Sequence, residues 1–413
     1  MKFSCKYNML VSHITSVRTV VEDPQSNEDM RNIIFKFEKT ETGFKATLIG
    51  VSKNITYKEK LDESDYTFEC AEDELKDGVL MFQLKSKELS DYLNAYKGVR
   101  KTKIDDIILD FGERNMIRCT VIEKLNDSDA TYTSRWHFNN IPIKPNMLPS
   151  INMTAPDVEL ETVDNLSLSF ATTCLIPNLQ AGDQTYSCLL FSEKDIVTIG
   201  STYTTIMKNN VVDEDNTVFK NMRFVYKSAE LLDKLVSDKS GATSFAKMDG
   251  RIYVSSERQE TIDGVDKVIE CEAFISYDEK IANYQTFKDA YRKDSYFVLD
   301  RLYLKDVLKR LSLVNESIEV QIKADEGVVT LRNSKFSQDI PMSKQESLDD
   351  MRRVNFKLLP GVLSKAIIGD DNLMCSYNPD TYIYLNRQNA NSFVVVFADN
   401  SDLWFSVVRT NTY

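Results

Sequence analysis

The stretch "YFVLDRLYLKDVLKRL", from Tyr296 to Leu311, joins two patterns at Asp300. Aromatic, β-branched and aliphatic residues fill the first four positions, which favours a β-strand. After Asp300, apolar residues recur at spacings of three and four, and most of the positions between them are basic. That spacing is typical of an amphipathic helix, and Asp300 stands where its N-cap is expected. The stretch therefore predicts a strand that runs directly into a basic helix.

The same strand-then-helix pattern occurs six times along the chain. The six copies begin at Lys2, Leu80, Val158, Met222, Tyr296 and Val354. Between them, apolar residues alternate in pairs of runs that predict β-hairpins. The predicted turns lie at Glu41–Gly43, Gly112–Asn115, Glu193–Asp195 and Asp325–Gly327. Each copy therefore predicts a strand, a helix and two or three antiparallel strands, and the fold class is α+β.

Two such units make one domain of ordinary size, so the 413 residues predict three similar domains. The first boundary falls in the proline-bearing stretch "NNIPIKPNMLPSIN", Asn139–Asn152, and the second in "YQTFKDAYRKDS", Tyr284–Ser295. The predicted domains are residues 1–148, 149–290 and 291–413.

Charge is distributed unevenly between the predicted helices and the rest of the chain. The formal net charge is −12, which argues against non-specific nucleic-acid binding by the surface as a whole. The six predicted helical segments nevertheless carry +8 between them, so the remainder carries −20. Basic charge is therefore segregated onto the helices, while strands and loops hold the acid.

Lysine and arginine repeated on successive helices predict sequence-independent, salt-sensitive contacts with phosphate. The alternative is that these residues form ordinary solvated helix faces, because both favour helices. The candidate phosphate contacts are Arg18, Lys97, Arg100, Lys101, Lys103, Lys234, Arg301, Lys305, Lys309, Arg310, Lys357 and Lys365.

The sequence contains no recognisable catalytic or metal-binding motif. It has only two histidines, His13 and His137, and no phosphate-binding or dinucleotide-binding glycine motif. Its seven cysteines are scattered without a CxxC pair, which indicates buried thiols in a reducing compartment. No apolar run reaches the length of a membrane span, and the N-terminus lacks a secretory signal. We therefore expect a cytoplasmic protein that is not an enzyme and needs no cofactor or metal.

The repeats, the three-domain count and the basic helices resemble the DNA polymerase sliding clamp superfamily, above all the three-domain bacterial and phage processivity clamps. "MKFSCKYNMLVSHITSVRTVV" is similar to that family's first strand and helix, and "FNNIPIKPNMLPSI" to its first connector. "ISYDEKIANYQTF", Ile275–Phe287, is similar to the stretch that closes the second domain. The resemblance implies six helices that face inward around duplex DNA, with the sheets outside.

The resemblance also implies partners and a second site. A three-domain subunit implies a homodimeric ring that tethers a DNA polymerase and is placed on DNA by a clamp loader. A pocket for partner peptides is implied between the second and third domains, at Ile199, Tyr203, Tyr284, Phe287, Val407 and Val408. These six could instead be core residues of a domain junction. The divergence suggests a phage-encoded version in the bacterial cytoplasm. An open clamp-like viral processivity factor and a phage structural or assembly protein that binds no DNA remain alternatives.

Overall fold

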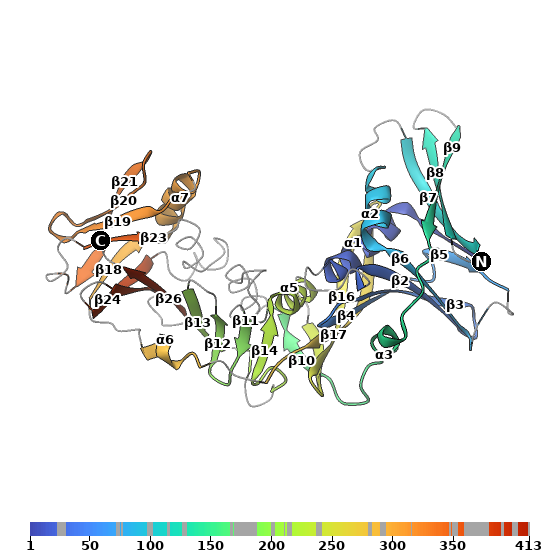
Figure 1. Cartoon of the computed structure of the whole chain (residues 1–413), viewed down its shortest axis with the longest axis horizontal. Helices are drawn as coiled ribbons and strands as arrows, with labels where there is room; N and C mark the ends of the chain where they lie inside the picture. Colours follow the sequence, from blue (N-terminus) through green and yellow to red (C-terminus); the bar gives the residue numbers. More distant parts are fainter. Residues whose placement is uncertain are drawn as a thin grey trace. The chain divides into compact units, whose positions relative to one another are not determined.

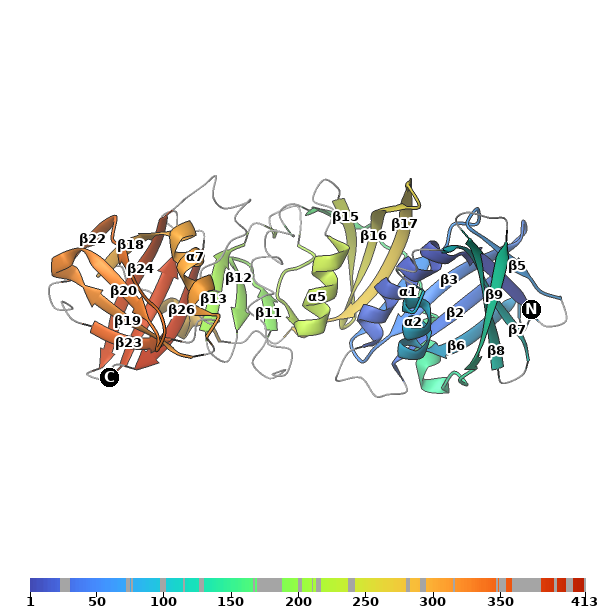
Figure 2. The same cartoon turned by 90° about the horizontal axis from the view of Figure 1, so that it is seen from above.

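A computed structural model of the chain gives its secondary structure and packing (Figures 1 and 2). It describes residues 1–22, 30–71, 75, 77–96, 102–113, 116–125, 130–165, 168, 188–199, 203–209, 211–212, 217–236, 242–279, 283–289, 295–314, 316–346, 348, 354–358, 380–389, 392–398 and 404–411. Contacts divide the chain into two compact units. Unit 1 is Met1–Asn165 with Lys234–Ser276, and unit 2 is Leu166–Asp233 with Tyr277–Tyr413.

Unit 1 holds two antiparallel sheets. The five-stranded sheet has the order β5-β1-β7-β8-β9, with bounds Tyr66–Glu69, Lys2–Lys6, Thr102–Glu113, Met116–Leu125 and Thr131–Asn139. The eight-stranded sheet has the order β10-β15-β16-β17-β4-β3-β2-β6. Its strands are Glu161–Asp164, Ala242–Met248, Arg251–Ile262, Val265–Ser276, Ile55–Lys60, Phe44–Val51, Asn32–Lys39 and Val79–Lys85.

Phenylalanine side chains fill the space between these two sheets. Phe3 of β1 contacts Phe35 and Phe37 of β2, and Phe111 of β7 stacks on Phe82 of β6 with ring centroids 3.9 Å apart. All five side chains are buried. Aromatic pairs of this kind add to the free energy gained by burying their apolar area.

Helices α1, Tyr7–Val21, and α2, Ser86–Asn94, lie side by side in unit 1 (Figures 1 and 2). α1 packs on β2, β3 and β4 through an almost wholly apolar face. At the crossing, Gly50 of β3 leaves room for Val17, because a Cβ there would lie 2.9 Å from a Val17 methyl. The short α3, Leu148–Ile151, follows the 3-10 turn Pro145–Met147 (η3) and packs against β3.

Unit 2 also holds two antiparallel sheets. The nine-stranded sheet has the order β14-β11-β12-β13-β26-β25-β24-β18-β22. Its strands are Met222–Val225, Cys188–Phe191, Asp195–Ile199, Tyr203–Lys208, Trp404–Asn411, Ser392–Ala398, Asp380–Asn389, Tyr296–Asp300 and Lys344–Glu346. The four-stranded sheet has the order β21-β20-β19-β23, with bounds Ser337–Pro341, Val328–Arg332, Ile318–Lys323 and Val354–Leu358. Helix α7, Arg301–Leu311, follows β18, and the short α6, Gln285–Asp289, precedes it.

The structure confirms the α+β class and four of the predicted strand–helix units. These are β1–α1, β6–α2, β14 with α5 (Tyr226–Leu235) and β18–α7. Asp300 caps α7 as predicted, since its side chain accepts a hydrogen bond of 2.7 Å from the Tyr303 N–H. The helices predicted in the third and sixth units fall largely outside the described residues. All four predicted hairpins form, and Gly327 takes the left-handed conformation at its turn, with φ of 65°.

At each predicted domain boundary, strands from the two neighbouring domains pair within one continuous sheet. β4 pairs with β17, which joins residues of the predicted first and second domains. β13 pairs with β26, which joins residues of the predicted second and third domains. The two compact units therefore follow a different division of the chain, and the three domains 1–148, 149–290 and 291–413 stay a prediction.

Candidate DNA-facing helices and partner-peptide site

Among the described helices, α7 carries the largest group of predicted phosphate contacts, namely Arg301, Lys305, Lys309 and Arg310. Leu304, Val307, Leu308 and Leu311 are buried and hold one face of the helix against unit 2. Lys309 and Arg310 are exposed on the other face, and Lys305 is half-buried. The Arg310 Cζ lies 5.7 Å from the centroid of the Phe336 ring, and the Arg310 Nε donates a hydrogen bond of 3.3 Å to the Asp306 carbonyl. Both contacts orient the guanidinium while leaving it at the surface, where phosphate could reach it.

Arg301 departs from the expectation of an exposed cation. It is the first residue of α7, and only 2 % of it is exposed. Its position three residues before Leu304 and seven before Leu308 places it on the apolar face of the helix. The expectation that Arg301 presents its charge to solvent is therefore wrong.

The other predicted cations are in different situations. Arg18 of α1 is half-buried and committed to protein partners, with Nε 2.6 Å from Glu22 and Nη1 2.5 Å from the Ser90 hydroxyl of α2. Lys103 in β7 and Lys234 in α5 are exposed. Lys357 lies in strand β23 opposite Glu319, so its placement on a helix was wrong. Lys97, Arg100, Lys101 and Lys365 lie outside the described residues.

A buried network of charges lies under α1. The His13 Nδ1 is 2.6 Å from Glu59 of β4, and the two side chains are 1 % and 0 % exposed. The Arg258 guanidinium of β16 is 3.2 Å from the same carboxylate, and the Tyr57 hydroxyl donates to it at 2.5 Å. Burial alone raises the pKa of Glu59, but the His13 hydrogen bond and the His13 and Arg258 charges outweigh it and hold the pKa below its usual value. This network fixes α1 to the eight-stranded sheet. His137, in contrast, is exposed on β9.

Three residues of the predicted peptide pocket come together in unit 2. Ile199, Tyr284 and Phe287 are partly buried and pack against one apolar cluster. The cluster consists of Leu190, Val197, Ile206, Tyr296, Val298 and Tyr384. Tyr203, Val407 and Val408 join the same sheet through the backbone, since Tyr203 pairs with Val408 and Thr204 with Val407. The surface formed by Ile199, Tyr284 and Phe287 is called the apolar patch below.

A polar anchor holds the segment that carries the apolar patch. The Tyr284 hydroxyl donates to the Asp195 carboxylate at 2.8 Å and lies 2.9 Å from the Ser192 Oγ. Lys288 of α6 forms an ion pair of 2.8 Å with Asp195. Burial raises the pKa of Tyr284, and the neighbouring Asp195 raises it further. Tyr284 is therefore a neutral donor at physiological pH, and its ring stays against the cluster.

Comparisons with known proteins identify the fold. No family model matches the sequence, and no curated protein matches it either. Among solved structures, the DNA polymerase III β subunit of Borrelia burgdorferi matches with a TM-score of 0.68 at 13% identity, over 99% of this chain and 98% of that one. The DNA polymerase sliding clamp of Bacillus subtilis matches with a TM-score of 0.66 at 12% identity, over 99% of this chain and 98% of that one. A putative DNA polymerase III β subunit from Eubacterium rectale matches with a TM-score of 0.65 at 12% identity, over 99% of both chains.

The chain has the sliding-clamp fold. That fold accounts for the repeated strand–helix units and for the sheets that run across the predicted domain boundaries. The described residues contain no group of three or more His, Cys, Asp or Glu side chains suited to holding a metal ion. In the described part of the chain, no helix is long and apolar enough to cross a membrane.

Two features of this sliding-clamp fold were missed from the sequence. One is the Glu59 network, whose members come from two strands and a helix and are joined only by folding. The other is a lysine-rich cavity on the face of β2, β3 and β4 opposite α1. A signal for the cavity was present, because Lys58 and Lys60 alternate on β4 and must share a face.

Proposed function

We propose that this chain is a DNA sliding clamp, a processivity factor that encircles duplex DNA and tethers a replicative polymerase without catalysing a reaction. The observation that carries the proposal is the match to sliding-clamp structures over 99% of the chain. The exposed Lys309, Arg310 and Lys234 on described helices of an acidic chain support it. They would supply weak, salt-sensitive phosphate contacts, which are sufficient for a protein linked topologically to DNA.

Two sheet edges in the described part of the chain support a head-to-tail homodimer. In each repeat, the third strand after the observed or predicted helix either lies at a sheet edge or pairs with the matching strand of another repeat. β4 pairs with β17, and β13 pairs with β26. β9 and β21 occupy the same place in their repeats, and each lies at a sheet edge in the described part of the chain. Pairing of β9 in one subunit with β21 in the next would form two equivalent heterologous interfaces and close a ring.

The apolar patch would take the apolar side chains of a short peptide motif. We propose that the polymerase and the clamp loader use this site in turn, in the bacterial cytoplasm. A modest affinity is enough, because a polymerase held on the same DNA meets its substrate at an effective concentration on the order of millimolar. A phage origin stays a prediction.

The dimer is tested by a pair of edge variants. We expect the wild-type chain to have a solution mass of about 95 kDa, twice the 47.4 kDa of one chain. Tyr132 and Trp136 are 55% and 48% exposed on β9, so Tyr132→Glu with Trp136→Glu should give monomers. On β21, Gln338→Pro and Asp339→Pro are tested singly, because the N–H groups of adjacent strand residues point in opposite directions.

Mixing distinguishes a head-to-tail interface from a symmetric one. Each monomeric variant keeps one undamaged edge, so a mixture of β9 and β21 variants should restore dimers through a single intact interface. Light scattering on the separate and mixed variants measures this. A wild-type mass of one chain would overturn the closed ring and favour the open clamp-like factor.

DNA contact is tested by reversing the charge of α7. Lys305→Glu, Lys309→Glu and Arg310→Glu together should reduce polymerase stimulation on primed circular DNA about tenfold or more, because like charge then faces phosphate. The control reverses three exposed lysines outside the helices, Lys2, Lys247 and Lys335. Equal stimulation by both triple variants and the wild type would make α7 an ordinary surface. A dimer that neither binds DNA nor stimulates any polymerase would favour a structural or assembly protein.

A further inference from the structure

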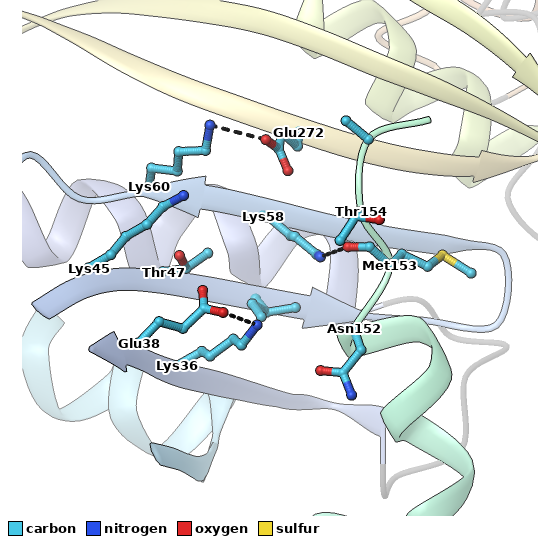
Figure 3. Close-up of a pocket in the computed structure, with 12 residues that line it drawn as sticks. Lys36, Glu38, Lys45, Thr47, Lys58, Lys60, Asn152, Met153, Thr154 and Glu272 are labelled. Atoms are coloured by element: carbon cyan, nitrogen blue, oxygen red, sulfur yellow. Dashed lines mark hydrogen bonds and ion pairs between the residues drawn. The ribbon is translucent and has the colours of Figure 1, made fainter. Parts of the chain in front are cut away.

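Unit 1 contains a cavity of about 250 Å³ on the face of the eight-stranded sheet opposite α1 (Figure 3). Its floor is formed by β2, β3 and β4, and one wall is the chain segment Asn152–Ala155, which follows α3. β17 contributes Glu272 to the other side. We call it the lysine cavity, because Lys36, Lys45, Lys58 and Lys60 all line it.

Strand register explains why these lysines converge. Lys36 of β2 pairs with Thr47 of β3, which pairs with Lys60 of β4, so the three form one cross-strand row. Ile49 and Lys58 form the adjacent pair. Because alternate residues of a strand share a face, Lys58 and Lys60 point into the cavity while Glu59 between them points toward α1.

The charges of the cavity do not balance. Lys36 forms an ion pair with Glu38 at 2.8 Å, and Lys60 forms ion pairs with Glu272 at 3.0 Å and with Glu270 of β17 at 2.8 Å. Among the described residues, no carboxylate forms an ion pair with Lys45 or Lys58. Four ammonium groups thus face three carboxylates, Glu38, Glu270 and Glu272, in a chain whose net charge is −12.

Lys58 is the most constrained of the four. It is 8% exposed, and its ammonium donates to the Met153 carbonyl and lies 5.3 Å from the Phe274 ring centroid. Burial lowers its pKa to about 8, with Lys36 and Lys45 lowering it further and Glu272 and Glu38 opposing them. A buried ammonium without a carboxylate partner is costly, and an incoming anion would relieve that cost.

We propose that the lysine cavity binds an acidic segment of a partner protein, with one or two carboxylate side chains entering between Lys45 and Lys58. Charge complementarity selects carboxylates, and the partly buried Met153 beside the lysines suits the methylene groups of glutamate. The lining lacks the features that favour a phosphate ligand. It contains no arginine, whose fork binds phosphate in two places, and its ammonium groups are spread over three strands.

The test measures binding of a fluorescent peptide, Gly-Glu-Glu-Leu-Glu-Glu-Gly, to the full chain by anisotropy. We expect a Kd on the order of 10–100 µM at low salt, weakening with ionic strength, and at least tenfold weaker binding when glutamine replaces every glutamate. Lys45→Glu with Lys58→Met should weaken the acidic peptide at least tenfold. The control Lys2→Glu with Lys335→Glu changes exposed lysines elsewhere and should leave affinity within twofold.

Lys45→Glu alone keeps the test decisive if Lys58→Met impairs folding, because Lys45 is half-buried and forms no ion pair with a carboxylate of the described residues. It should lower affinity at least fivefold with an unchanged melting temperature. Equal binding of the glutamate and glutamine peptides, or unchanged binding by Lys45→Glu, would overturn the proposal. Displacement of the peptide by inorganic triphosphate at a tenth of the peptide's own concentration would identify a phosphate site instead. None of these readouts depends on ring closure or on the apolar patch.

Discussion

The two connecting segments of the molecule lie over sheet faces of opposite chemistry. In unit 1, the segment after α3 and a cross-strand row of Lys36, Thr47 and Lys60 line the same cavity. In unit 2, the segment around α6 covers the row Leu190, Val197 and Ile206, which occupies the same three strands of its repeat. The two repeats therefore share their strand arrangement but carry different side chains on the corresponding sheet face, charged in unit 1 and apolar in unit 2. We infer that the two faces recognise different partners, one acidic and one apolar.

Glu59 offers the strongest test of the unit 1 side of this comparison. Glu59→Ala should lower the free energy of unfolding by about 3 kcal/mol, because it leaves the Arg258 and His13 side chains without their carboxylate. Tyr57→Phe is the matched control. It removes one hydrogen bond to the same carboxylate and should cost about 1 kcal/mol. Urea unfolding of both variants measures the difference.

The same network predicts a pH dependence. The folded-state pKa of Glu59 lies below its unfolded value, so its contribution is fully present above pH 4.5 and is lost as pH falls through the folded pKa. Wild-type stability should therefore fall more steeply below pH 4.5 than that of Glu59→Ala. Parallel curves would show that the network does not couple α1 to the sheet through charge.

The apolar patch tests the unit 2 side. Ile199→Asp with Phe287→Asp should weaken binding of a polymerase-derived apolar peptide about 100-fold, because carboxylates then stand where apolar side chains would bind. Val265→Asp with Val268→Asp is the matched control, since both valines are 55% exposed on β17. Peptide titration and polymerase stimulation should change together in the first variant only. If stimulation stays normal, the partner site is elsewhere and the comparison between the connectors fails.

Much of this architecture could be predicted from local sequence. The turn at Asp325–Gly327 and the cap at Asp300 are fixed by neighbouring residues, and both form as expected. Alternation and helical spacing likewise located four strand–helix units. Arg301 was assigned by its charge, although its spacing from Leu304 and Leu308 already placed it on the buried face.

The features that could not be predicted depend on pairing between segments far apart in the sequence. The lysine cavity needs β17 to pair with β4 and the segment after α3 to return over the sheet, and neither follows from local pattern. Lys357 was counted with the helix predicted in the sixth unit, yet β23 extends through Leu358. In unit 2 the resemblance, rather than spacing, brought Ile199 and Tyr284 together, and the structure packs both on one cluster.

Lys58 gives the smallest and most specific test of the comparison. Its folded-state pKa, about 8, is below the ordinary lysine value of 10.5. Below pH 8 the side chain is charged in both states, so the folded chain bears the full cost of a buried ammonium. Between pH 8 and 10.5 the unfolded chain holds the extra proton, and stability therefore rises with pH.

Lys58→Met removes this titration and fills a similar volume. We expect it to stabilise the chain by about 1 kcal/mol at pH 7, a figure reduced for solvent screening in the open cavity, and to flatten stability between pH 8 and 10. The groups facing Lys58 are Lys36 and Glu38 of β2, Lys45 of β3, Lys60 of β4 and Glu272 of β17. Lys335→Met, at an exposed site, is the control and should change neither quantity.

A Lys58→Met chain that is less stable at pH 7 would mean that the Met153 hydrogen bond outweighs desolvation. The lysine would then be a structural clip for the segment after α3, and the acidic partner would have to be bound by Lys45 alone.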